Sequence, residues 1–119
     1  MPADSPVDFV YRLILRPDWA AAQDAGIAPL RAVDRADGYL HLSTRAQVIE
    51  TANRHFAGAT DLLALEIPLD AIADKVKFEP APKRGEDFPH LYGALSVADV
   101  TRVIALALTP DGFQFGDAE

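Results

Sequence analysis

Two short stretches of the sequence place histidines and tyrosines in an alternating pattern. Tyr39, His41 and Ser43 alternate with leucines, and His90 and Tyr92 have the same spacing further along the chain. Side chains alternate between the two faces of a strand, so each histidine is expected to share a face with a phenol. Imidazole and phenol groups both donate and accept hydrogen bonds, and a face that carries them can orient a polar ligand. His41 is therefore the first candidate site residue.

Three further residues allow a functional and a structural interpretation. Glu79 follows Phe78 and is either a solvated carboxylate at a sheet edge or a base that faces the histidines. His90 either joins the same site or only fastens the adjacent loop. His55 falls on the apolar face of a predicted helix, where a partly buried structural histidine is the favoured interpretation. The spacing of the three histidines matches no short metal motif, so we predict no metal site.

Common catalytic and nucleotide motifs are missing from the sequence. Ser43 is not surrounded by the G-x-S-x-G pattern of a nucleophile elbow. The seven glycines are spread singly, and neither G-x-G-x-x-G nor a Walker A pattern occurs. We therefore expect neither a Rossmann nor a P-loop nucleotide site.

The composition limits the classes of protein that fit. The 119 residues predict a single domain, residues 1–119, with loose tails at 1–8 and 116–119. A net charge of −7 argues against nucleic-acid binding but leaves room for a pocket that binds one small anion. No apolar run is long enough for a membrane span, and no secretory signal is visible. With no cysteine, a cytoplasmic location is expected, whereas the oligomeric state is left open.

Hydrophobic patterning predicts the elements that position these residues. Helices are expected at 19–25, where Trp19 would anchor the helix to a sheet, and at 44–56, which Thr44 and Gln47 open as a capping box. The connection 27–36 is expected to be irregular, and residues 81–89 to form a mobile polar loop. Two early helices followed by several strands predict an α+β fold with a mixed or antiparallel sheet. The expected strands are residues 9–15, 39–43, 62–67, 76–79, 103–108 and 113–115.

The quoted residues resemble a family of small bacterial proteins known as domain-of-unknown-function family 952. The resemblance rests on D-G-Y-L-H-L-S at 37–43, F-E-P at 78–80 and F-P-H-L-Y-G at 88–93, and it extends over roughly residues 8–115. It implies a fold related to the ADP-ribosyltransferases, in which a split sheet surrounds an NAD-binding cleft.

The resemblance also implies roles for the candidate residues. His41 would contact the ribose next to nicotinamide, Tyr92 would stack on nicotinamide, and Glu79 or His90 would complete the site. His41, Glu79 and His90 are therefore the catalytic candidates.

The ligand-contact candidates are Tyr39, His41, Ser43 and Tyr92. NAD is the leading candidate substrate, and the expected reaction breaks the nicotinamide–ribose bond.

Two alternatives to this function are left open. One is a module that binds a nucleotide or a phosphorylated metabolite without catalysis. Its anion contacts would come from Arg31, Arg35, Lys83 and Arg84. The other is a metal-dependent hydrolase.

Overall fold

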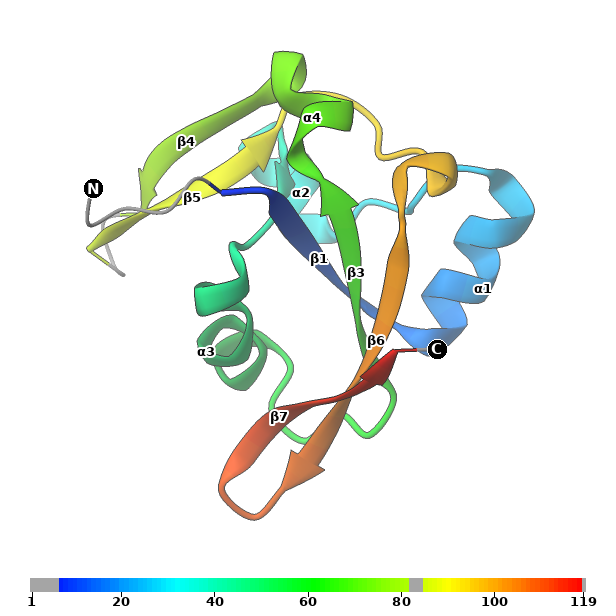
Figure 1. The fold of residues 1–119 in the computed structure, drawn as a ribbon, viewed down its shortest axis with the longest axis vertical. Helices are drawn as coiled ribbons and strands as arrows, with labels where there is room; N and C mark the ends of the chain where they lie inside the picture. Colours follow the sequence, from blue (N-terminus) through cyan, green and yellow to red (C-terminus); the bar gives the residue numbers. More distant parts are fainter. Residues whose placement is uncertain (1–6, 82–84, 119) are drawn as a thin grey trace.

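Two antiparallel sheets form the framework of the computed structural model, which describes residues 7–81 and 85–118 (Figure 1). The four-stranded sheet has the order β1-β3-β6-β7, and the three-stranded sheet has the order β2-β5-β4. The prediction of an α+β fold with antiparallel strands is confirmed. The strands are β1 (Phe9–Leu15), β2 (Leu40–His41), β3 (Leu62–Pro68), β4 (Val76–Ala81), β5 (Glu86–Leu91), β6 (Arg102–Thr109) and β7 (Gly112–Ala118). The helices are α1 (Arg16–Ala25), α2 (Ala32–Asp37), α3 (Arg45–His55) and α4 (Leu69–Ile72), with 3₁₀ turns at Ala73–Lys75 and Val97–Asp99.

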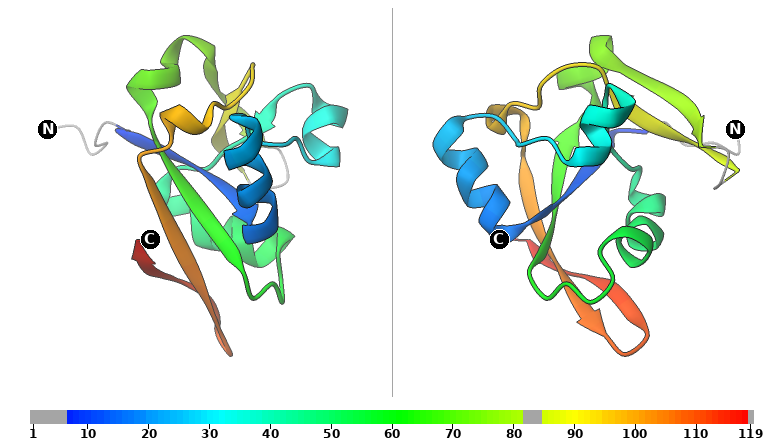
Figure 2. Two further views of the ribbon diagram at one scale, coloured as in Figure 1. Left: turned by 90° about the vertical axis from the view of Figure 1, so that its right-hand side faces the viewer. Right: turned by 180° about the vertical axis from the view of Figure 1, so that it is seen from behind.

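The core lies on both faces of the four-stranded sheet. Along β1, Val10 and Ile14 pack into a cluster with Ala22 of α1, whereas Tyr11 packs on the opposite face with Val48 of α3. Views from two sides place α1 and α3 on opposite faces of this sheet (Figure 2). This arrangement follows from the alternation of side chains along an apolar strand that is buried on both faces.

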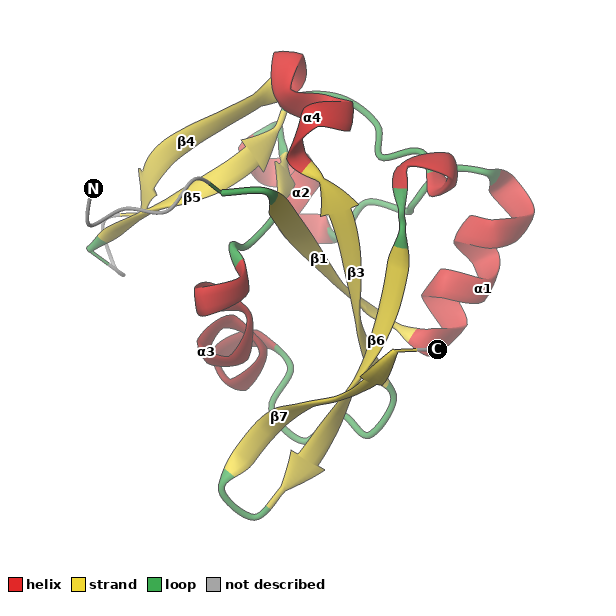
Figure 3. Cartoon of the chain, in the orientation of Figure 1, coloured by secondary structure: helices red, strands yellow, loops and turns green. Residues whose placement is uncertain are grey.

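The two sheets separate beside β1. Ser43 pairs with Tyr11 of β1 through backbone hydrogen bonds of 2.7 and 2.9 Å. Two residues earlier, His41 pairs with β5 instead, and the Leu42 amide donates to the Pro89 carbonyl at 3.1 Å. The segment 40–43 therefore crosses from the small sheet to the large one, and the two groups of strands are distinct in Figure 3.

The helices differ from the prediction in two places. The connection 27–36 contains α2, which was not expected, so three helices precede β3 instead of two. The Asp34 carboxylate accepts a hydrogen bond from the Arg31 amide at 2.6 Å, and Gly38 ends the helix in the left-handed region with φ of 84°. Helix α1 begins at Arg16, before the expected start at Trp19, with Pro17 in its first turn.

The extended segments also differ in extent. The expected strand 39–43 is reduced to Leu40–His41, because its later residues leave the small sheet. Residues 86–89 of the expected loop belong to the strand Glu86–Leu91 and Ala81 ends β4, while residues 82–84 lie outside the described part. The expected tail at 116–118 is the end of β7, and the other expected tail is described only at residues 7 and 8.

Gln47 connects the start of α3 to the small sheet. Its Oε1 atom accepts from the Thr44 amide at 3.0 Å, as the T-x-x-Q pattern predicts. Its Nε2 atom donates to Glu86 Oε1 at 2.9 Å and to the Asp87 carbonyl at 2.7 Å. One side chain therefore both caps the helix and holds the beginning of β5.

Replacing Gln47 by alanine should lower the free energy of unfolding by about 1–3 kcal/mol, since a buried polar group loses its partners. Urea denaturation measures the change. Gln23→Ala is the matched control, because Gln23 is exposed on α1, and it should alter stability by less than about 0.5 kcal/mol. Equal effects of the two substitutions would contradict a linking role for Gln47.

Candidate functional site

A buried ion pair joins β1 to α2 at the base of the site. Arg12 Nη2 lies 2.6 Å from Asp34 Oδ2, and Arg12 Nη1 lies 3.1 Å from Asp34 Oδ1. The two side chains are 3% and 0% exposed. Arg12 Nη1 also donates to the His41 carbonyl at 3.0 Å, and the His41 amide donates to Asp34 Oδ1 at the same distance. The pair thus fixes the backbone of β2 as well as α2.

The imidazole of His41 lies between two carboxylates. Its Nδ1 atom is 2.8 Å from Asp34 Oδ1, and its Nε2 atom is 2.8 Å from Asp37 Oδ2. Both carboxylates come from α2. An ionised carboxylate only accepts hydrogen bonds, so each contact forms when the ring nitrogen that faces it carries the proton. The ring orientation is therefore set by the helix that ends just before β2.

Hydrogen bonding keeps Asp34 ionised. Burial alone would raise the pKa of its carboxyl group, but hydrogen bonds from His41 and Arg12 and the Arg12 charge outweigh burial. They hold the pKa of Asp34 well below its usual range. The carboxylate next to His41 Nδ1 is therefore negatively charged throughout the physiological range of pH.

Aromatic rings gather on the face of the small sheet around His41. His41 and His90 are directly opposite each other on β2 and β5, with ring centroids 5.7 Å apart. The Tyr39 ring stacks on His90 at 3.9 Å and 20°, and its centroid is 4.7 Å from that of His41. Tyr92 completes the group, 5.4 Å from Tyr39. Two imidazoles and two phenols therefore share one face.

Glu79 of β4 is the acceptor in this group. The Tyr92 hydroxyl donates to its Oε1 atom at 2.6 Å, and His90 Nδ1 lies 2.9 Å from the same oxygen. The hydrogen bond from Tyr92, followed by that from His90, lowers the pKa of Glu79. The same bond raises the pKa of Tyr92 to about 12. Glu79 is thus an ionised carboxylate directed by two neighbours, and its side chain is 34% exposed.

Five of the six residues expected from the sequence lie in this cluster. The five are Tyr39, His41, Glu79, His90 and Tyr92, and we refer to them as the histidine–tyrosine cluster. Ser43 does not join them, because residue 43 has already crossed to the large sheet. It is buried, and its hydroxyl donates to Thr51 Oγ1 at 3.4 Å.

Three residues of the site were not expected from the sequence. Asp37 belonged to the quoted motif at 37–43 without a role in the site, and Asp34 lay in the expected connector. Arg12 was included in an apolar strand. A charged residue in such a strand was the signal that could have indicated the ion pair, because a buried arginine requires an acidic partner. His55 was expected to be partly buried. This expectation is wrong, since His55 lies exposed at the end of α3.

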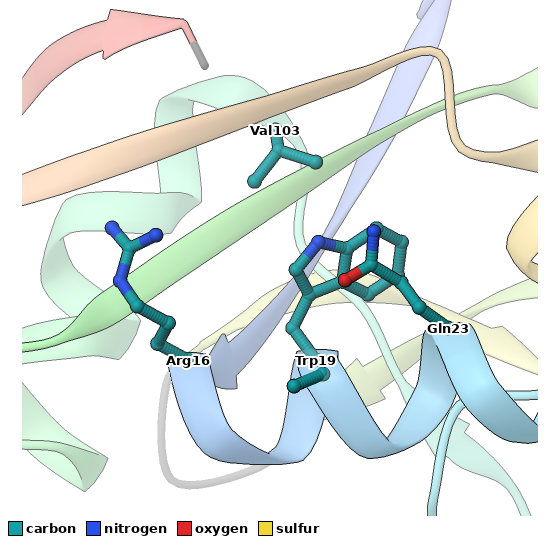
Figure 4. Close-up of a pocket in the computed structure, with 5 residues that line it drawn as sticks. Arg16, Trp19, Gln23 and Val103 are labelled. Carbon is teal, nitrogen blue, oxygen red and sulfur yellow. The ribbon is translucent and has the colours of Figure 1, made fainter.

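Two cavities in the described part of the chain lie outside the cluster, since none of its five residues lines either of them. One, of about 330 Å³, lies between α1 and β6, where Arg16, Trp19 and Gln23 project toward Val103 (Figure 4). Trp19 also packs against the core, as expected of an anchor for α1. The other, also of about 330 Å³, is lined by Arg12, Arg31 and Phe56 among others. The cluster itself is an open face, on which Tyr92 is 40% exposed.

The part of the chain that the structure describes has no metal-binding cluster and no membrane-spanning helix. Within residues 7–81 and 85–118, no three or more histidine, aspartate or glutamate side chains gather in a way that could hold a metal ion. None of the helices in those ranges is long and apolar enough to cross a membrane.

Comparisons with known proteins agree with this fold. A family model described as "Protein of unknown function (DUF952)" matches residues 13–103. The chain belongs to the DUF952 family. The X-ray structure of protein CC0527 from Caulobacter crescentus is similar, with a TM-score of 0.82 and 38% identity over 89% of this chain and 93% of that one. The solution NMR structure of CC0527 has a TM-score of 0.77 and 38% identity, covering 88% of this chain and 90% of that one. No curated protein matches the chain.

The low pKa of Asp34 predicts how stability depends on pH. Its contribution to stability is complete above the pKa of an unfolded aspartate, about 4, and is lost as the pH falls toward the folded value. Asp34→Asn should lower the free energy of unfolding by about 3–5 kcal/mol at neutral pH, because Arg12 loses its charged partner. Between pH 6 and pH 3, the wild type should lose more stability than the variant, as measured by urea denaturation.

The control for this comparison is Asp24→Asn, which changes an exposed aspartate on α1. Its acid dependence should follow that of the wild type. A wild type and an Asp34→Asn variant that lose stability in parallel would show that Asp34 does not supply the pH-dependent contribution.

The hydrogen bond between Tyr92 and Glu79 predicts a shift in tyrosine ionisation. Glu79→Gln removes the negative charge, so the pKa of Tyr92 should fall from about 12 toward the ordinary value of 10. NMR of the tyrosine ring carbons as a function of pH measures the change for each tyrosine separately. Glu50→Gln, which alters an exposed ion pair with Arg54, should leave Tyr92 unchanged. An unchanged Tyr92 in Glu79→Gln would contradict the contact.

Proposed function

We propose that the histidine–tyrosine cluster binds the nicotinamide–ribose end of NAD or a related nucleotide and acts on the bond between nicotinamide and ribose. The observation that carries this proposal is the ionised Glu79 carboxylate, which Tyr92 and His90 direct onto the same face as His41. The fold proposed is related to the ADP-ribosyltransferases, and the separation of the two sheets beside β1 supports it.

The chemistry of the cluster suits this reaction. When the bond from ribose C1′ to the nicotinamide nitrogen breaks, its electron pair leaves with nicotinamide and positive charge develops on the sugar. A fixed carboxylate such as Glu79 stabilises that charge without reorganisation. Water or another acceptor then bonds to C1′, and Glu79 or His90 takes its proton. Tyr39 and Tyr92 offer ring faces for the nicotinamide, and His41 offers a donor for a ribose oxygen.

The arginines behind His41 support an anionic ligand. Arg12 lines the second cavity and is joined to His41 through Asp34, so the cavity and the cluster meet at one ion pair. Burial, followed by the neighbouring charge of Arg12, lowers the pKa of Arg31 in the same cavity. A phosphate group placed there would relieve this repulsion and accept bidentate hydrogen bonds. We also propose a cytoplasmic location, since a chain without cysteine suits a reducing compartment.

The second candidate function is a binding module without catalysis. The open position of the cluster favours it, because water would reach a reacting sugar freely and enzymes that transfer reactive groups exclude water. The same residues would then hold a nucleotide or a phosphorylated metabolite, with Arg31 as an anion contact. Turnover of NAD separates the two candidates, since only the first predicts it.

Binding is tested by titrating the protein with NAD while following the ring resonances by NMR. Resonances of His41 and Tyr92 should shift at micromolar to millimolar NAD, and His41→Ala should weaken binding by about 10-fold or more through the loss of a hydrogen-bond donor. His55→Ala is the matched control, because His55 is exposed at the end of α3. No shift at these rings with millimolar NAD would rule out the proposed site.

Catalysis is tested by following nicotinamide release. Glu79→Gln should lower the rate about 10²–10³-fold, because removing one electrostatic contact to the transition state has an effect of this size. Binding without release of nicotinamide, in the wild type and in His55→Ala, would favour the non-catalytic module instead.

A further inference from the structure

We infer that Asp37 occupies the place of a ligand oxygen on His41 Nε2, and that a ligand must displace this carboxylate in order to bind. The inference rests on the proposed function for the location of the ligand. It adds the chemistry recognised at this atom, which is an oxygen that accepts a hydrogen bond from the imidazole. Asp37 therefore lowers the affinity for the ligand, because it competes with the ligand for the same ring nitrogen.

The two carboxylates that flank His41 are held very differently. Asp34 is fully buried, and it accepts hydrogen bonds from Arg12, the Arg31 amide and the His41 amide. Asp37 is 42% exposed, and within the described residues its carboxylate has His41 as its hydrogen-bond partner. Rotating Asp37 away therefore breaks one contact at the surface, whereas moving Asp34 would disrupt α2 and β2.

This asymmetry assigns a different role to each ring nitrogen. Nδ1 faces inward and is anchored, so Asp34 is the positioning residue for the imidazole. Nε2 faces the open side, where it contacts Asp37, and the neighbouring groups of the ring as a whole on this face are Asp37, Tyr39 and His90. Among these, Asp37 is the group in direct hydrogen-bond contact with Nε2. A ligand oxygen that reaches the same nitrogen must therefore take its position.

The expected change in ligand affinity follows from the partial exposure of Asp37 to solvent. Ion pairs that are partly exposed to solvent contribute about 0.2–1 kcal/mol, so removing Asp37 should tighten ligand binding by up to about fivefold. Two kinds of oxygen fit the site, a sugar hydroxyl and a phosphate oxygen. Titrations with D-ribose and with inorganic phosphate distinguish these two kinds of oxygen. D-Ribose carries no charge, so the loss of electrostatic repulsion from the Asp37 carboxylate would not by itself change the affinity for D-ribose.

The experiment compares the wild type with Asp37→Ala and with Asp74→Ala, which removes an equal charge from an exposed position before β4. Nitrogen-15 chemical shifts of the His41 ring are recorded first in the free proteins. In Asp37→Ala the Nε2 shift should change and the Nδ1 shift should remain, while Asp74→Ala should match the wild type. An unchanged Nε2 shift would overturn the inference whether or not NAD binds.

Titrations with NAD, D-ribose and phosphate follow on the same three proteins. Tighter binding of NAD and of at least one small probe to Asp37→Ala alone supports the inference. Tightening of a small probe without any NAD binding supports the inference and rejects the proposed function. Binding of NAD with equal affinity in all three proteins overturns the inference and keeps the proposed function. Absence of binding by all three compounds rejects both.

Discussion

The buried contact between Arg12 and Asp34 is the interaction on which the rest of the site depends. Removing two charges from water is costly, and the cost is offset only where further hydrogen bonds satisfy both groups. Asp34 meets this condition with donors from β1, α2 and β2. Arg12 meets it less fully, because its Nε atom is buried without a partner. The arrangement therefore contributes geometry more than stability, by joining three elements whose backbone pairing alone is slight.

The separation of the two sheets explains why such a contact is needed. β2 contributes two residue pairs to the small sheet, whereas β1 and β3 are paired over seven. A strand this short cannot fix its own side chains, so His41 relies on α2 for its backbone and for its ring. Across the small sheet, His90 and Glu79 are positioned by the longer β4–β5 pairing and by Gln47 from α3. Two sets of contacts therefore position the cluster. Helix α2 positions His41, and the β4–β5 pairing together with Gln47 positions His90 and Glu79.

The residues that face one another were predictable, but the framework that holds them was not. Alternation along a strand placed Tyr39 with His41 and His90 with Tyr92, because that pattern is local. It failed for Ser43, since a crossing between sheets is decided by tertiary contacts. Helix α2 was missed for a similar reason. Its N-terminal hydrogen bond is accepted by Asp34, whose burial depends on Arg12 of a distant strand, and a segment of six residues is too short to form a stable helix by its own propensity.

The position of both carboxylates on α2 has a consequence for how the sequence can vary. Asp34 and Asp37 are separated by nearly one helical turn, which places them at two levels of the same helix face, about 4.5 Å apart along the axis. Adding or removing one residue between them would turn one carboxylate by about 100° and take it away from the imidazole. Ala36, which lies exposed between them, is not held by packing, so its type is less constrained. In this segment, the length of the chain is therefore more tightly constrained than the identity of the residues within it.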